Sequence, residues 1–132
     1  MSFWRKIFGY SQREIWHQVA KDKGARFIFG TAMEGDKIEY KVKDNFVTVY
    51  ITTKGNSWYT VFESYINQTD LFVDKLYINS LKKKGITVIP LKETEGRDYY
   101  FLQMKDEGIQ ADSVLLKERM DFFGNAIEKA LK

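Results

Sequence analysis

Cysteine is absent from the 132 residues of this sequence, and histidine occurs once, as His17. The absence of cysteine excludes disulfides, thiolate metal ligands and a cysteine nucleophile, and it is compatible with a reducing compartment. A single histidine without cysteine does not supply the usual ligands of a zinc site. His17 follows Trp16 at the margin of a helical apolar stripe, so we interpret it as a boundary residue rather than a catalytic one.

Proline occurs once, and the nine glycines are scattered, so no stretch resembles a disordered linker. No apolar run approaches the ~20 residues of a membrane span, and no signal-peptide pattern opens the chain. We therefore expect one domain over 1–132 in the cytoplasm, with attachment to the surface of a membrane as the alternative. The net charge of +3 is too small to imply a nucleic-acid partner without a clustered patch.

Catalytic and cofactor motifs are also missing. The sequence has no phosphate-binding loop, no dinucleotide-binding glycine triplet and no nucleophile elbow. The carboxylate pairs Glu93 with Glu95 and Asp106 with Glu107 are interpreted as charge in solvated turns. We expect no enzyme, no cofactor and no metal, and the alternative is a dispersed carboxylate site at Glu63 and a neighbour across the sheet.

Helical patterns lie at both ends of the chain. Ser11 and Glu14 have the spacing of a capping box, which predicts a helix over 12–22 that ends at Gly24. Apolar residues recur every three or four positions over 113–131, which predicts a second amphipathic helix capped by Asp112 or Ser113. Gly124 inside this helix indicates either a bend or close packing.

Between the helices, short β-branched and aromatic runs alternate with turn residues, as is typical of an antiparallel meander. The fold class that this order predicts is α+β, with six to seven strands flanked by an N-terminal and a C-terminal helix. Pro90 is expected at a strand end or a sheet edge. Strands are predicted near 26–32, 37–43, 46–53, 58–66, 71–78, 86–91 and 98–104.

A two-residue hairpin turn at Gly55 and Asn56 sets the register of the two longest predicted strands. Lys54 then faces Ser57, and Val49 faces Phe62. One face is the predicted core and carries Val47, Val49, Ile51, Trp58 and Phe62. The other carries Thr48, Tyr50, Thr52, Tyr59, Val61, Glu63 and Tyr65.

Aromatic residues are in excess, at 16% of the chain, and they suggest three candidate contact surfaces. The first is the second sheet face, although cross-strand stabilisation explains its threonines and tyrosines equally well. The second is the N-terminal segment over residues 1–10, whose alternative is to fold back on the sheet, and the third is a basic run that also fits a solvated turn. Their candidate residues are Tyr50, Tyr59, Glu63 and Tyr65 for binding, and Phe3, Trp4, Ile7, Phe8, Lys82, Lys83 and Lys84 for interfacial contact.

The central part of the chain, 24–77, resembles uncharacterised bacterial α+β domains. The matching residues are Gly35, Asp36 and Lys37, followed by 47–53, 59–62, 65–67 and 71–77. This resemblance implies a fold neighbourhood and no site residues. Separately, strands followed by one C-terminal helix look like the layout of pleckstrin-homology-type barrels, which are scaffolds for lipid or peptide binding.

The excess of aromatic residues, together with the missing catalytic motifs, predicts a non-enzymatic domain. We expect it to bind a protein, which includes a second copy of itself, or a small ligand. The alternative is a peripheral module that contacts lipid headgroups through Trp4, Phe8 and the lysines at 82–84.

Overall fold

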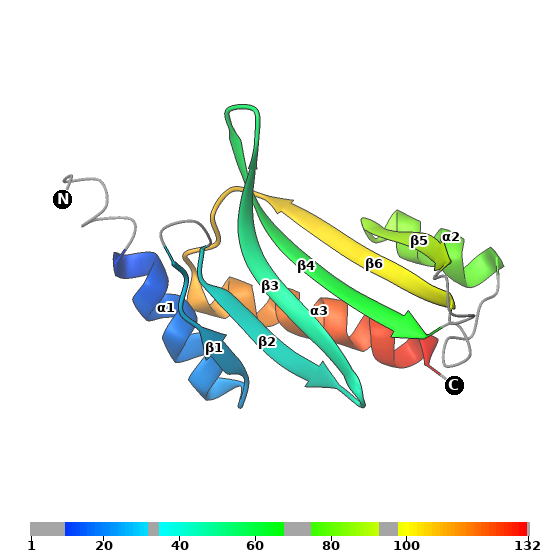
Figure 1. Ribbon diagram of the computed structural model, residues 1–132, viewed down its shortest axis with the longest axis horizontal. Coiled ribbons are helices and arrows are strands. Elements are labelled where there is room, and N and C mark those ends of the chain that lie inside the picture. The colour runs from blue at the N-terminus through cyan, green and yellow to red at the C-terminus, as the bar shows by residue number, and fades with distance from the viewer. Residues whose placement is uncertain (1–9, 32–34, 68–74, 93–97, 132) are drawn as a thin grey trace.

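Six antiparallel strands form one sheet in the computed structural model, which describes residues 10–31, 35–67, 75–92 and 98–131 (Figure 1). The strand order is β1-β2-β3-β4-β6-β5, so β1 and β5 are the two edges and the sheet is open. The α+β prediction is confirmed, whereas the barrel layout is wrong because the edge strands do not meet. The elements are α1 (Tyr10–Asp22), β1 (Arg26–Ile28), β2 (Lys37–Val42), β3 (Asn45–Lys54), β4 (Ser57–Asn67), α2 (Lys75–Lys83), β5 (Ile86–Lys92), β6 (Asp98–Glu107) and α3 (Ser113–Ala130).

The β3–β4 hairpin has the register that its turn residues predict. Lys54 pairs with Ser57, and Val49 pairs with Phe62. Gly55 has a φ of 63°, a left-handed conformation that glycine adopts without a steric cost. Pro90 lies in the edge strand β5, where its missing N–H costs the sheet least.

Helices α1 and α3 cover one face of the sheet, and no helix among the described residues lies over the other face (Figure 1). The core lies between these two layers, and Trp16, Phe62 and Phe123 are its largest fully buried side chains. Gly124 allows α3 to approach β2 closely, because a Cβ at this position would lie 3.3 Å from Val42 Cγ2. Of the two predictions for Gly124, close packing is confirmed.

The helix ends agree in part with the sequence signals. The Asp112 side chain accepts a hydrogen bond from the Leu115 N–H at 3.0 Å, so Asp112 is the N-cap of α3. Gly24 ends α1 with a φ of 64°, as predicted. The capping box at Ser11 is wrong, because α1 begins at Tyr10 and Ser11 already lies inside the helix.

The predicted strand at 71–78 is the main error in the elements: its residues 75–78 belong to the helix α2, Lys75–Lys83, and 71–74 lie outside the described residues. The helix buries Leu81 in the core, with 1% of its surface exposed. The predicted turn at 82–85 is instead the end of this helix, where the Gly85 N–H donates to Lys82 O at 3.0 Å. The predicted strand at 26–32 is shorter, since β1 ends at Ile28. Within the described ranges, no helix has the length and apolar character needed to cross a membrane.

Two predictions at the far end of the sheet are also wrong. Trp58 has the side-chain direction of the core face but is 52% exposed, because the hairpin extends beyond the helix layer (Figure 1). Asp106 and Glu107 are the last residues of β6 rather than a turn, and the turn follows at Gly108, whose φ is 87°. Asp106 forms a two-point ion pair with Arg119 of α3, with both N–O distances at 2.8 Å.

Candidate binding surfaces

The open face of the sheet, which is the face away from α1 and α3, carries side chains in rows that cross the strands. Antiparallel partners lie opposite each other, so each row follows from the register. We name the four rows as follows. The aromatic row is Lys41, Phe46, Tyr65, Phe101 and Ile89; the acidic row is Arg26, Glu39, Thr48, Glu63, Gln103 and Thr87; the lysine row is Ile28, Lys37, Tyr50, Val61 and Lys105; and the end row is Thr52, Tyr59 and Glu107.

The four candidate binding residues lie on this face, as the alternation of the strands predicted, but in four different rows. Tyr50 and Glu63 are in direct contact, because the Tyr50 hydroxyl donates to Glu63 Oε2 at 2.9 Å. Gln103 Nε2 donates to the same oxygen at 3.3 Å. Burial and the neighbouring Glu63 carboxylate raise the pKa of Tyr50 to about 12. These hydrogen bonds hold the side chains of Tyr50, Glu63 and Gln103 in place at the centre of the open face.

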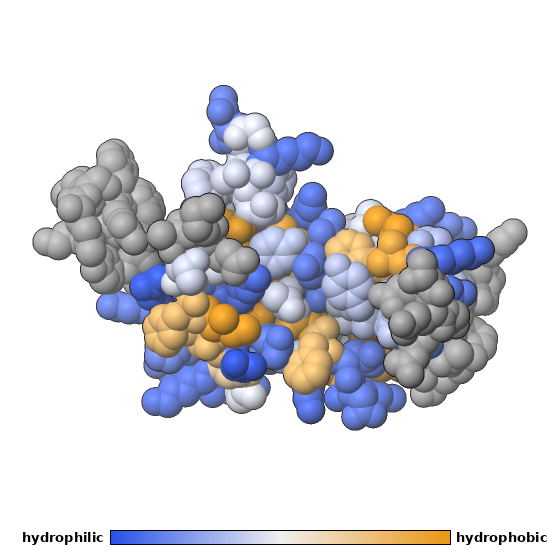
Figure 2. All heavy atoms as spheres, viewed as in Figure 1, coloured by the Kyte–Doolittle hydropathy of each residue, from blue (hydrophilic) through white to orange (hydrophobic). Residues whose placement is uncertain are grey.

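The aromatic row is the most exposed apolar feature of the open face. Tyr65 is 57% exposed, Phe46 is 49% exposed and Ile89 is 46% exposed. The rings of Tyr65 and Phe101 pack with their centroids 4.9 Å apart. Sequence reasoning missed Phe101 and Ile89, because their strands have no short hairpin turn between them from which the pairing could be read. Figure 2 shows apolar patches over β1 and over β5 and β6, separated by polar residues.

A polar hollow of about 270 Å³ adjoins Glu63, and Asp44, Thr48 and Tyr65 also line it. Two carboxylates therefore border one hollow on the open face. Glu63 Oε2, however, accepts hydrogen bonds from both Tyr50 and Gln103. These bonds favour a structural role for Glu63 as an acceptor over a role as a proton donor. The dispersed carboxylate site stays a prediction.

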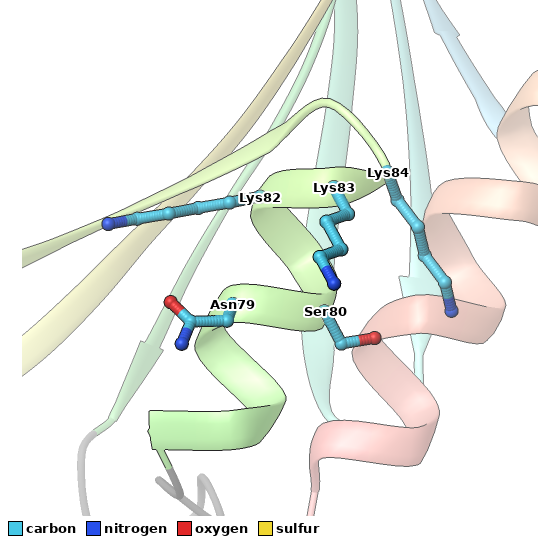
Figure 3. A pocket seen from close by; sticks show the side chains of 5 residues that line it. All are labelled: Asn79, Ser80, Lys82, Lys83 and Lys84. Atoms are coloured by element: carbon cyan, nitrogen blue, oxygen red, sulfur yellow. The ribbon is translucent and has the colours of Figure 1, made fainter.

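The basic run does not converge on one point (Figure 3). Asn79, Ser80 and the three lysines line an open hollow of about 680 Å³ at the end of α2. Lys83 and Lys84 extend on one side of the helix end, whereas Lys82 extends on the opposite side. This divergence follows from the helix, which spreads consecutive residues around its axis. The three lysines therefore border one hollow without pointing to a common point in it.

Several predicted features lie outside the described residues. These are Phe3, Trp4, Ile7 and Phe8, together with Glu93 and Glu95. His17 is described, and it stacks on Phe27 with ring centroids 4.8 Å apart. No cluster of metal-ligating side chains occurs in the part of the chain that the structure describes.

A second hollow, of about 530 Å³, lies at the far end of the sheet and was not predicted. Its wall joins three segments that are distant in sequence: α1 contributes Gln12, the hairpin contributes Trp58, and the connection from β6 to α3 contributes Ile109. Trp58 and Ile109 are 52% and 40% exposed, so both present apolar surface there. We call this the Trp58 hollow.

Hydrogen bonds hold the connection beneath the Trp58 hollow in place. The Thr60 hydroxyl donates to Gly108 O at 2.9 Å and accepts from the Gln110 N–H at 3.0 Å. The Trp16 indole N–H donates to Gln110 O at 2.6 Å, and the Gly108 N–H donates to Trp58 O at 2.7 Å. The hollow is consequently built on fixed backbone.

Comparisons with known proteins leave the function to be argued from these surfaces. No family model matches the chain, and no curated protein matches its sequence. Among solved structures, the chain is similar to YbjN from E. coli, described as a proposed transcription regulator. That similarity has a TM-score of 0.49 at 10% identity and covers 90% of this chain and 94% of YbjN. These outcomes agree with the weak resemblance to uncharacterised domains.

Proposed function

We propose that this chain is a non-enzymatic interaction domain that associates with a second copy of itself through the open face of its sheet. The observation that carries the proposal is the exposed aromatic row, in which Tyr65, Phe101 and Ile89 lie side by side on three neighbouring strands. Aromatic side chains supply large contact areas at protein interfaces. An exposed apolar patch on a soluble domain commonly marks such an interface.

The charges of the open face favour a protein surface over a polyanion. Arg26 and the lysines at positions 37, 41, 54 and 105 share the face with glutamates at positions 39, 63 and 107. A nucleic acid or an anionic membrane would meet the acidic side chains as repulsive groups. A protein surface that carries acidic and basic side chains can pair with both kinds of charge on the open face.

The order of the rows supports a second copy as the partner. A two-fold axis that runs between the acidic row and the lysine row exchanges these two rows between the copies. Glu39 then faces Lys37 of the second copy, and Tyr65 faces the second copy's Tyr59. Two sheets packed face to face keep their strands within ~30° of each other, which preserves this correspondence approximately.

Sedimentation velocity of the full chain over micromolar to millimolar concentrations tests the proposal. We expect a monomer–dimer equilibrium that weakens at least about tenfold in the double variant Tyr65→Ser with Phe101→Ser, because two aromatic anchors are lost. Val114→Ser is the matched control, since Val114 is 64% exposed but lies on α3. A chain that stays monomeric throughout overturns the proposal.

A charge exchange tests the orientation of the two copies. Lys37→Glu should weaken the dimer about two- to fivefold, because it places two carboxylates opposite each other. The double variant Lys37→Glu with Glu39→Lys restores opposite charges and should restore the affinity. Equal losses in the single and the double variant would reject the two-fold arrangement.

Deletion of residues 1–9 separates the open face from the N-terminal candidates Phe3, Trp4, Ile7 and Phe8. If the open face makes the contact, the shortened chain dimerises with the same affinity as the full chain. The lipid-headgroup alternative has no converging lysines at 82–84 to support it and stays a prediction.

A further inference from the structure

The helix layer ends before the hairpin end of the sheet, and Trp58 lies beyond it on the helix side. Trp58 has the same side-chain direction as Thr60, two residues later in β4, and Thr60 is fully buried. The Thr60 hydroxyl donates to Gly108 O, so the connection from β6 to α3 lies on this side as well. Both Trp58 and Ile109 of that connection are exposed, and apolar surface therefore remains uncovered directly beyond the buried residues.

Helix α1 directs one line of side chains toward this surface. Gln12 lines the Trp58 hollow, and Trp16, one turn later, donates its indole N–H to Gln110 O beneath the hollow at 2.6 Å. Residues four apart lie on one side of a helix, so the sequence continues this line toward the N-terminus with Phe8 and Trp4. Two aromatic residues thus precede the side chains that meet the hollow.

The connection through α1 keeps Phe8 close to the hollow. Consecutive Cα atoms are about 3.8 Å apart, so the Phe8 Cα lies within about 15 Å of the Gln12 Cα in any conformation. A short tether of this kind gives the attached segment an effective concentration in the millimolar range. Apolar contacts that are weak between separate molecules are sufficient at such a concentration.

We propose that residues 1–9 dock in the Trp58 hollow of their own chain, with Trp4 and Phe8 against Trp58 and Ile109. The docked segment extends the helix layer over the hairpin end and removes these apolar side chains from water. The volume of the hollow, about 530 Å³, lies within the range of pockets that enclose a drug-sized molecule, which is comparable to two aromatic side chains.

The floor of the hollow is fixed before the segment docks. The Gly108 N–H donates to Trp58 O at 2.7 Å, and the Thr60 hydroxyl bonds both Gly108 O and the Gln110 N–H. Docking therefore has to order only the segment itself. Since Trp58 points to the helix side and the aromatic row lies on the open face, this inference does not depend on the dimer proposed above.

A spin label at residue 2 of the full chain tests the inference. Because the chain has no cysteine, Ser2→Cys provides a single attachment site for a nitroxide. The spin-labelled nitrogen-15 chain is diluted in chain that carries neither label, so that contacts within one molecule are observed. We expect strong broadening of the Trp58 indole resonance, assigned with Trp58→Phe, and of the Ile109 amide resonance. Sharp resonances at both groups would overturn the proposal.

Two variants of the spin-labelled chain distinguish docking from the closeness that the tether alone produces. Trp4→Ser with Phe8→Ser keeps the tether and removes the aromatic contacts, so most of the broadening should be lost. Arg5→Ser with Lys6→Ser is the matched control, because helical spacing turns both residues away from the line of Trp4 and Phe8, and the broadening should remain. Equal broadening in the aromatic variant and the original labelled chain would reject docking.

A mixing experiment shows whether the segment comes from the same copy of the chain. A nitrogen-15 chain without the spin label is mixed with an equal amount of spin-labelled chain without nitrogen-15. The resonances of Trp58 and Ile109 should stay sharp. Broadening as strong as in the first experiment would mean that the segment of a second copy fills the hollow, and the docking within one chain would be wrong.

Discussion

At the scale of single residues, the contact with Glu63 changes the acidity of the Tyr50 phenol. Burial and the Glu63 carboxylate raise the pKa of Tyr50 to about 12, compared with about 10 in an unfolded chain. The folded state therefore favours the neutral phenol. The stability that this preference contributes is present in full below pH ~10 and is lost as the pH rises from ~10 to ~12.

Glu63→Gln should lower the pKa of Tyr50 toward 10 without reaching it, because the largest cause, burial, remains. Absorbance titration of phenolate formation measures this change, with Tyr50→Phe to identify the transition. Burial also raises the pKa of Tyr40, whose hydroxyl donates to Met120 O at 2.8 Å, so the variant is needed for the assignment. An unchanged curve in Glu63→Gln would show that the carboxylate does not act on the phenol.

At the scale of elements, the contact of α3 with β2 depends on the absence of a side chain at Gly124. A Cβ there would lie 3.3 Å from Val42 Cγ2 and 3.5 Å from Tyr40 Cε2. Gly124→Leu should lower the free energy of unfolding by about 1–3 kcal/mol, although leucine favours helices by ~1 kcal/mol over glycine. Urea denaturation measures the change.

The matched control for Gly124→Leu is Asn125→Ala, at the next and exposed position of the same helix. We expect it to leave the midpoint unchanged or raise it slightly, since alanine has the higher helix propensity. If Gly124→Leu is as stable as the original chain, the helix can move away from β2 and the close packing is not required.

The sequence predicted an element correctly where residues close together in the chain determine its geometry. Gly55 and Asn56 fix a tight turn, so the register of Val49 with Phe62 followed from the sequence. The run at 71–78 has the β-branched and aromatic composition of a strand, and tertiary packing that buries Leu81 decides for the helix instead. A signal for α2 was present, since lysines followed by Gly85 are typical of a helix C-terminus.

The candidate sites were predictable only where they lie within one hairpin. Alternation along β3 and β4 placed Tyr50, Tyr59, Glu63 and Tyr65 on one face, as the structure confirms. It could not show that Trp58 lies beyond the helix layer, because alternation gives the direction of a side chain and not the extent of its cover. The Trp58 hollow needs α1 and the connection after β6, and a single sequence does not show that Gln12 and Ile109 line the same hollow.

At the scale of the whole molecule, the proposed dimer contact combines two kinds of interaction. The aromatic row relies on apolar area, which salt affects little. The pairs between the acidic row and the lysine row are exposed charges, which salt screens. The net charge of +3 specifies neither interaction.

Raising the salt concentration should separate these two parts of the contact. Between about 50 mM and about 500 mM sodium chloride, the loss of dimer affinity caused by Lys37→Glu should become smaller, because exposed charges are screened. The loss caused by the double variant Tyr65→Ser with Phe101→Ser should stay the same, because this variant removes apolar area. Sedimentation velocity at the two salt concentrations measures both effects. If the loss in the double serine variant disappears at high salt, charge rather than the aromatic row holds the two copies together.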